Sequence, residues 1–166
     1  MGTSSLKSTV ITNRDATPRV ANNARLNGAH LRSAFGYVTA AAADDTASRY
    51  RVCELPSNAI VRAVYLSSVA QGGTAAVDVG VYRNTADGGA SVSTGLFGTA
   101  VSVVSAVSRS EITNESTTYS LDKQEQPLWQ AAGLTSDPGG TLDVVIAPTA
   151  ALTNGGRIGV EVQYVI

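Results

Sequence analysis

Residues 157–166 read RIGVEVQYVI and form the longest alternating stretch in the chain. Apolar side chains recur at every second position on one face, and mostly polar residues or glycine lie opposite. The first face holds Ile158, Val160, Val162, Tyr164 and Ile166. A period of two is typical of a β-strand with one buried face. Because a strand at the end of a chain needs sheet neighbours to stay ordered, we expect this one to pair within a sheet.

Similar segments recur towards the N-terminus. Val and Thr, which favour pleated surfaces, are frequent, and paired glycines mark the ends of several segments with the positive φ angles that tight turns need. Residues 100–107 fit either a strand or a short helix, and their valines favour a strand. The expected strands are Phe35–Thr39, Ser48–Leu55, Ala59–Ser67, Ala76–Arg83 and Leu142–Ile146, with the alanine-rich stretch Ala40–Ala47 as a loop. Six to eight strands predict an all-β fold, an antiparallel β-sandwich, with a jelly roll as the preferred topology.

One short helix is expected near residue 128. Pro127 suits the first helical position, and Gly133 suits the residue that ends a helix. Trp129, the only tryptophan, has two interpretations. It either plugs the end of the sandwich or anchors a subunit interface, where tryptophan is enriched.

The first 34 residues differ in composition from the rest. They hold five bases and one acid, a net charge of +4, whereas residues 35–166 hold seven bases and twelve acids, a net charge of −5. Without sustained apolar periodicity, such a segment cannot bury enough surface to order itself. We therefore predict an extended basic N-terminal arm, residues 1–34, beside a β-sandwich domain, residues 35–166.

Within this arm, Val10 and Ile11 are expected to form a short strand that pairs with a neighbouring molecule. Residues 14–18 end in proline and predict a turn or an extended segment. The arm residues that we expect to contact a larger partner or a second subunit are Val10, Ile11, Arg14, Asp15, Arg19 and Arg25, and Trp129 is the candidate in the domain.

The sequence offers little for catalysis. His30 is the only histidine and lies in the arm, and Cys53, the only cysteine, is expected to be a small buried group on a strand. A catalytic triad would need His30 on a rigid scaffold beside a nucleophile, which the arm does not offer, and one histidine with one cysteine cannot form a zinc site. We therefore predict a protein that is not an enzyme and has no cofactor.

The arm lacks aromatic residues and the whole chain has a net charge of −1, which argues against nucleic-acid binding. No apolar run is long enough to predict a membrane helix.

Three sets of segments carry a resemblance to a known family. The first is ITNRDATP at residues 11–18. The second is LPSNAIV at residues 55–61, followed by DVGVY at residues 78–82. The third is PLW at residues 127–129, with DPGG at residues 137–140 and the closing strand. Together they resemble capsid cement (head decoration) proteins of tailed bacteriophages.

The resemblance implies a virion protein assembled in the bacterial cytoplasm and located on the outer surface of the capsid. It implies a homodimer or homotrimer that bridges neighbouring major capsid proteins and stabilises the head. Partners would be the major capsid protein and other copies of the chain, without direct contact to nucleic acid or membrane. Two alternatives stay open: a tail or other virion surface component, and a carbohydrate-binding β-sandwich module.

Overall fold

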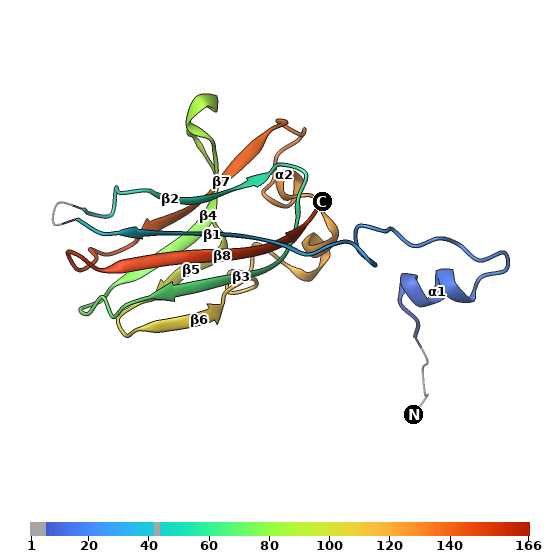
Figure 1. The fold of residues 1–166 in the computed structure, drawn as a ribbon, viewed down its shortest axis with the longest axis horizontal. Coiled ribbons are helices and arrows are strands. Elements are labelled where there is room, and N and C mark those ends of the chain that lie inside the picture. The colour runs from blue at the N-terminus through green and yellow to red at the C-terminus, as the bar shows by residue number, and fades with distance from the viewer. Residues whose placement is uncertain (1–5, 42–43) are drawn as a thin grey trace. The chain divides into compact units, whose positions relative to one another are not determined.

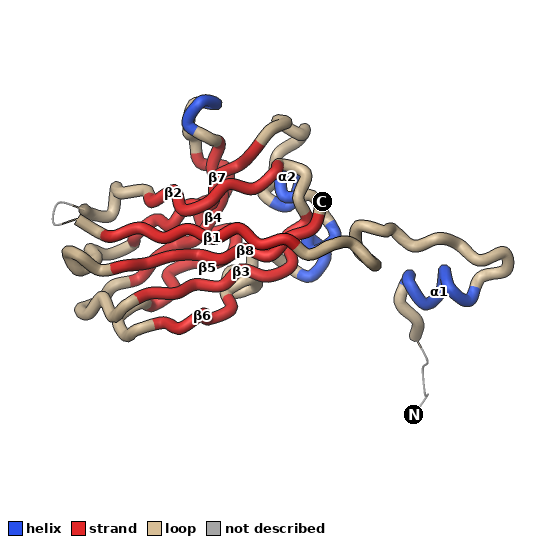
Figure 2. Tube along the Cα trace, in the orientation of Figure 1, coloured by secondary structure: helices blue, strands red, loops and turns tan. Residues whose placement is uncertain are grey.

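The computed structural model describes residues 6–41 and 44–166, and within them eight strands form two four-stranded antiparallel sheets (Figure 1). Figure 2 shows that the helices are short segments and that the strands are longer. The strands are β1 (Arg32–Thr39), β2 (Tyr50–Pro56), β3 (Ile60–Ser68), β4 (Ala76–Arg83), β5 (Ser91–Ser102), β6 (Val107–Glu111), β7 (Thr141–Pro148) and β8 (Arg157–Val165). The helices are α1 (Thr9–Asp15), α2 (Leu128–Ala131) and the 3₁₀ turns η1 (Thr85–Asp87) and η2 (Leu121–Glu125).

The strand order is nested. One sheet runs β1-β8-β3-β6 and the other β2-β7-β4-β5, so that β1 pairs with β8, β2 with β7, β3 with β6, and β4 with β5. The chain crosses between the sheets at every connection except β4 to β5. This confirms the predicted antiparallel β-sandwich. We interpret the nesting as a long antiparallel hairpin folded across two sheets, the arrangement of a jelly roll.

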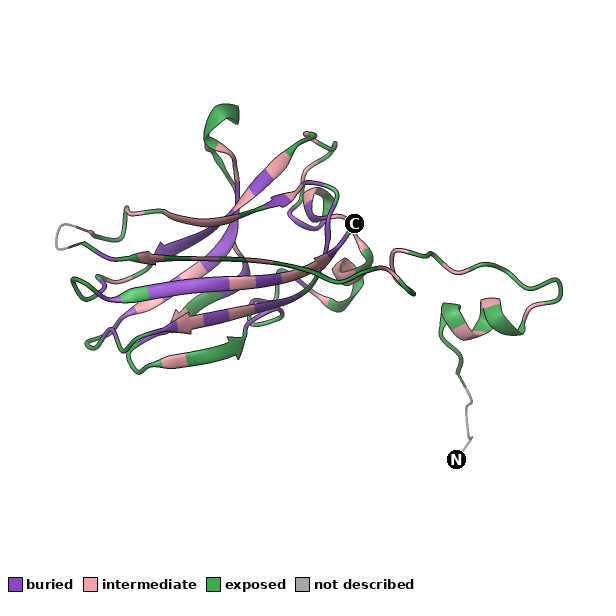
Figure 3. Cartoon of the chain, viewed as in Figure 1, coloured by how far each residue is buried: buried purple, intermediate pink, exposed green. Residues whose placement is uncertain are grey.

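The closing strand β8 lies inside its sheet, between β1 and β3. Its inward side chains Ile158, Val160 and Val162 are at most 1% exposed and belong to the central apolar cluster. Figure 3 shows β8 mostly buried, whereas β6 at the sheet edge is largely exposed. The alternation therefore predicted the buried face correctly up to Tyr164. Ile166 follows the end of β8 and is 40% exposed, so its predicted place on that face was wrong.

The two sheets come into close backbone contact where the edge strands β1 and β2 meet. A Cβ atom on Gly36 would lie 1.5 Å from the carbonyl oxygen of Val52, a distance that no side chain tolerates. Glycine at this position lets the β1 backbone press against β2. This contact brings the two sheets together along one side of the sandwich.

Strands β5 and β6 were missed by the sequence prediction. β5 reads SVSTGLFGTAVS, which contains few alternating apolar residues, and its pairing with β4 shifts register three times. β6 reads VSRSE and has no buried residue. The ambiguous segment 100–107 divides between the end of β5, a connection, and the first residue of β6. Polar edge strands with bulges carry no clear period, and they also discourage edge-to-edge pairing.

The loop predicted at Ala40–Ala47 is confirmed for its described residues, while Ala42 and Ala43 lie outside them.

Near residue 128, Pro127 caps α2 rather than starting its first turn. Gly133 follows the helix with a φ of 93°, as predicted for a residue that ends a helix. The backbone N–H groups of Leu128 and Trp129 donate to the carbonyls of Ala59 and Ser57 at 2.7 and 3.0 Å. α2 is thereby fixed to the start of β3.

The residues up to His30 form a compact unit separate from the sandwich unit, which begins at Leu31. The predicted strand at Val10 and Ile11 was wrong, because both residues lie in helix α1. Ser8 caps this helix by accepting a hydrogen bond from the Ile11 N–H, and the Thr12 hydroxyl donates to the Ser8 carbonyl at 3.0 Å. Local capping thus outweighs the strand preference of branched residues.

The end of the N-terminal segment also differs from the predicted boundary. β1 begins at Arg32, so Arg32, Ser33 and Ala34 form part of the sandwich. Residues 1–5 of the predicted arm lie outside the described residues. The role of the segment up to His30 as a docking arm stays a prediction.

Gly36→Ala tests the close approach of β1 and β2. Because the added methyl group would overlap the Val52 carbonyl, we expect a loss of about 3 kcal/mol in the free energy of unfolding, measured by denaturant titration. Thr39→Ala, at an exposed site on the same strand, serves as the control and should change stability little. Equal stability of Gly36→Ala and wild type would contradict the packing described here.

Candidate interaction surfaces

Helix α1 carries four of the seven predicted interface residues. Val10 is 37% exposed and Ile11 is half-buried, and none of the seven residues of the helix is fully buried. Arg14 and Lys7 each form an ion pair of 2.8 Å with Asp15. The Arg14 guanidinium, and then the Lys7 ammonium, hold the pKa of Asp15 below its ordinary value. Arg14 and Asp15 are therefore paired with each other within the segment.

The loop after α1 folds back on the helix. The Asn13 amide donates to the Asn22 side-chain oxygen at 2.9 Å, and the Asn22 amide donates to the Val10 carbonyl at 3.3 Å. The Val20 N–H reaches the Asn13 carbonyl at 3.1 Å. The segment thus has local structure of its own, although the sequence predicted it to be extended.

The other three predicted residues are dispersed. Arg19 is exposed in this loop, and Arg25 is half-buried in a turn, where its N–H donates to the Asn23 side-chain oxygen at 2.9 Å. Trp129 belongs to the sandwich unit, is half-buried, and packs against the central apolar cluster. This packing fits the interpretation of Trp129 as a plug, and its role in an interface stays a prediction.

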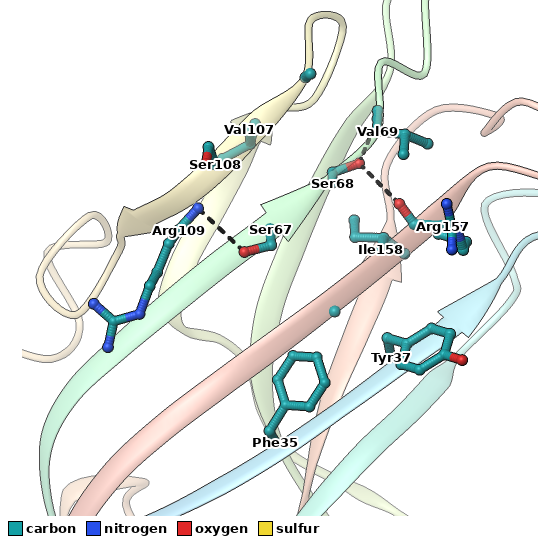
Figure 4. A pocket seen from close by; sticks show the side chains of 12 residues that line it. Phe35, Tyr37, Ser67, Ser68, Val69, Val107, Ser108, Arg109, Arg157 and Ile158 are labelled. Carbon is teal, nitrogen blue, oxygen red and sulfur yellow. Dashed lines mark hydrogen bonds between the residues drawn. The ribbon is translucent and has the colours of Figure 1, made fainter.

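A hollow of 440 Å³ lies on the outer face of the sheet β1-β8-β3-β6, as Figure 4 shows. Its middle is Gly159, which pairs with Tyr37 on one side and with Ser67 on the other. Because Gly159 has no side chain, the outer face is hollowed at this point. A Cβ atom there would lie 2.7 Å from the Tyr37 Cβ and from the Gly36 carbonyl oxygen.

Two aromatic side chains of β1 line this hollow. Phe35 and Tyr37 are 63% and 61% exposed, and their ring centroids lie 6.3 Å apart. Large rings with this exposure mark interaction sites more often than isolated exposed aliphatic residues do. Both residues were predicted to lie on a strand, but not to form part of a candidate interaction surface. Their spacing of two, which places both on one face of the strand, was the available signal.

Arg109 on β6 forms part of a polar network that crosses the same face. Its guanidinium lies 3.9 Å from the Tyr65 ring centroid and donates two hydrogen bonds to Glu161, at 3.0 and 3.1 Å. The Ser33 hydroxyl donates to Glu161 at 3.3 Å. The Arg109 hydrogen bonds hold the pKa of Glu161 below its ordinary value of 4.5. All four strands of the sheet are linked by these side chains.

Arg157 lines the hollow at the first residue of β8. Its side chain is exposed and, in the part of the chain that the structure describes, pairs with no carboxylate. Its backbone carbonyl accepts hydrogen bonds from the Val69 N–H and the Ser68 hydroxyl. The hollow therefore combines two exposed rings with one positive charge that has no counter-ion among residues 6–41 and 44–166.

His30 and Cys53 belong to different units of the chain. His30 is exposed in the N-terminal unit. Cys53 is half-buried on β2, and burial, with Asp143 as a smaller cause, raises the pKa of its thiol to about 12. Among residues 6–41 and 44–166, no group of three or more His, Cys, Asp or Glu side chains could hold a metal ion. No helix in these ranges is long and apolar enough to cross a membrane.

Comparison with known proteins gives a structural relation only. No family model and no curated protein matches the chain. Among solved structures, a chain of the cyanophage Pam1 capsid asymmetric unit is similar at 25% identity and a TM-score of 0.57, over 89% of this chain and 93% of the other. A chain of the capsid of Ralstonia phage GP4 aligns at 13% identity and a TM-score of 0.44, over 82% and 84%. The Pam1 similarity covers nearly the whole of both chains, so the two are of similar length. It supports a phage capsid-associated structural protein.

The ion pair of Glu161 predicts a pH dependence. Because the folded-state pKa of Glu161 is lowered, its pair with Arg109 stabilises the fold above pH 4.5, and this stabilisation is lost as the pH falls through the folded-state value. Glu161→Gln should therefore melt below wild type at pH 7, and the difference should shrink as the pH falls below 4.5. Glu115→Gln, which removes an exposed carboxylate without an ion pair among the described residues, is the control. A melting difference that stays constant with pH would contradict the assignment.

The raised pKa of Cys53 predicts a thiol that reacts slowly with alkylating agents. At pH 8 in the folded protein the reactive thiolate is scarce, so alkylation by iodoacetamide should be roughly a hundredfold slower than in guanidinium-unfolded chain. Mass spectrometry of timed samples measures both rates. Similar rates in the two states would show that Cys53 is accessible and ionised.

Proposed function

We propose that this protein is a capsid cement protein, which binds the outer surface of a phage capsid and bridges neighbouring major capsid proteins to stabilise the head. The observation that carries the proposal is the similarity to a chain of the Pam1 capsid over nearly its full length. The alignment covers 89% of this chain and 93% of the other, so it includes most of the sandwich. A small all-β chain with a separate N-terminal unit suits attachment to a larger assembly.

The docking element in this proposal is the N-terminal unit. Helix α1 spans seven residues and buries none of them fully. A helix this short is marginal in water, since most helical stability in proteins comes from packing an apolar face. Val10 and Ile11 would supply that face against a capsid surface. The local caps and the Asn13–Asn22 bond reduce the entropy lost when the unit docks.

Charge supports the same assignment. The N-terminal unit, up to His30, holds four bases and one acid, a net charge of +3, and Arg14, Arg19 and Arg25 lie on or after α1. Because the rest of the chain is acidic, the basic N-terminal unit and the sandwich favour partner surfaces of different charge. An acidic capsid surface would attract the N-terminal unit and hold the sandwich outward.

Bridging requires that one protein contact more than one capsid subunit. In the proposed arrangement the chain forms a homodimer or homotrimer, with Trp129 at a subunit contact, and each copy contributes one N-terminal unit. Several modest contacts then act together, because each later binding event is intramolecular. The protein acts without catalysis, cofactor, nucleic acid or membrane, as a component of the virion surface.

Removing residues 1–30 tests this assignment. The cut leaves β1 intact, since that strand begins at Arg32, so the sandwich should fold with wild-type circular dichroism. We expect the shortened chain to lose cosedimentation with capsids that lack the protein. The matched control is the full chain with Thr9→Ala, which keeps the Ser8 cap and the basic residues.

A folded sandwich that still cosediments like wild type would show that the N-terminal unit is not the docking element. A full chain that does not bind capsids under any condition would count against the cement function itself and would favour a tail or other virion surface component.

A further inference from the structure

The hollow on the outer face of β1-β8-β3-β6 combines aromatic and charged side chains that take no part in the proposed docking of the N-terminal unit. We infer that this hollow binds an acidic sugar residue, a hexuronate within a polysaccharide chain. The inference concerns the sandwich alone and does not depend on capsid binding through the N-terminal unit. It adds a ligand-binding activity to a protein whose proposed function is structural.

The aromatic rings supply the first part of the recognition. Phe35 and Tyr37 lie next to each other on β1, with ring centroids 6.3 Å apart and planes inclined by 32°. The negative face of an aromatic ring attracts the weakly positive C–H groups on the apolar side of a pyranose ring. Both rings stand on a regular strand held by β8, so little side-chain freedom is lost on binding.

The shape of the hollow suits one sugar residue of a longer chain. Its 440 Å³ falls in the range of small-molecule sites. Gly159 keeps the middle clear, and the Cβ contacts that would form there show that this position accepts no larger residue without a shift of Tyr37. As Figure 4 shows, Phe35 and Tyr37 lie on one side of the hollow, with Ser108 and Arg109 on the other.

Charge selects an acidic ligand. The Arg109 guanidinium is already paired with Glu161, whereas Arg157 is exposed and pairs with no carboxylate among the described residues. An Arg–carboxylate pair is among the stronger hydrogen-bonded contacts, and its fork geometry matches a uronate. The exposed Ser108 hydroxyl can exchange hydrogen bonds with sugar hydroxyls. By the same argument, the basic N-terminal unit of another copy is a poor occupant, because it would bring like charges together.

Calorimetric titration of the full chain with tetragalacturonate tests the inference. The fully methyl-esterified tetramer is the matched neutral ligand, since it keeps the rings and removes the charge. We expect saturable binding of the acid and binding weaker by about tenfold for the ester. Tyr37→Ala and Arg157→Gln should each weaken binding of the acid by about tenfold, whereas Tyr37→Phe keeps the ring and should bind like wild type.

Two control variants lie outside the hollow. Leu121→Ala removes an 81% exposed apolar side chain, and Arg32→Gln removes one exposed positive charge from the same sheet, so both should bind like wild type. Because Tyr37 and Arg157 are exposed, their replacement should leave the fold intact, which thermal melting checks.

Three results would overturn the inference. The first is an absence of saturable binding to tetragalacturonate. The second is equal affinity for the acid and its ester. The third is loss of capsid cosedimentation in Tyr37→Ala and Arg157→Gln without any sugar binding by wild type, which would make the hollow a protein-docking face. Failure of capsid binding by the wild-type chain leaves the sugar titration readable, so the two proposals fail separately.

Discussion

The position of β8 between β1 and β3 is the constraint on which the rest of the structure depends. With β8 paired on both sides, its inward residues Val160 and Val162 must face the core, and Gly159 and Glu161 must lie on the opposite, outer face of the sheet. A slip of one residue would exchange the two sets. The core and the hollow are therefore two consequences of one register. The close contact of β1 with β2 at Gly36 then joins this sheet to the other.

Period-two patterns were enough to predict most of the sandwich. Strands β3, β4, β7 and β8 carry Val, Ile and Leu at positions that the core buries, so their existence followed from sequence. β5 and β6 could not be predicted from the apolar pattern, because an edge strand needs no continuous apolar face. Helix α1 was mistaken for a strand, since the Ser8 cap is a local hydrogen bond whose effect on two branched residues is easily underestimated.

The candidate sites were less predictable than the fold. The hollow joins Tyr37 to Gly159 and Ser67, and such pairings between distant strands depend on register, which no single segment contains. Arg157 and Phe35 likewise line the same hollow only because β1 and β8 are neighbours in the sheet. The interface residues on α1 were instead chosen from composition, and their role follows from charge and exposure rather than from a shaped pocket. The N-terminal unit and the hollow thus present two different kinds of surface, one basic and short, the other aromatic and rigid.

The central claim is that the N-terminal unit docks on a capsid while the sandwich keeps its fold. Hydrogen exchange of the full chain, free and bound to capsids, measures this residue by residue. We predict that amides of residues 8–22 exchange rapidly in the free protein and slowly on capsids, while amides of β3, β7 and β8 are protected equally in both states. Equal protection of residues 8–22 with and without capsids, under conditions where the protein is bound, would contradict the account.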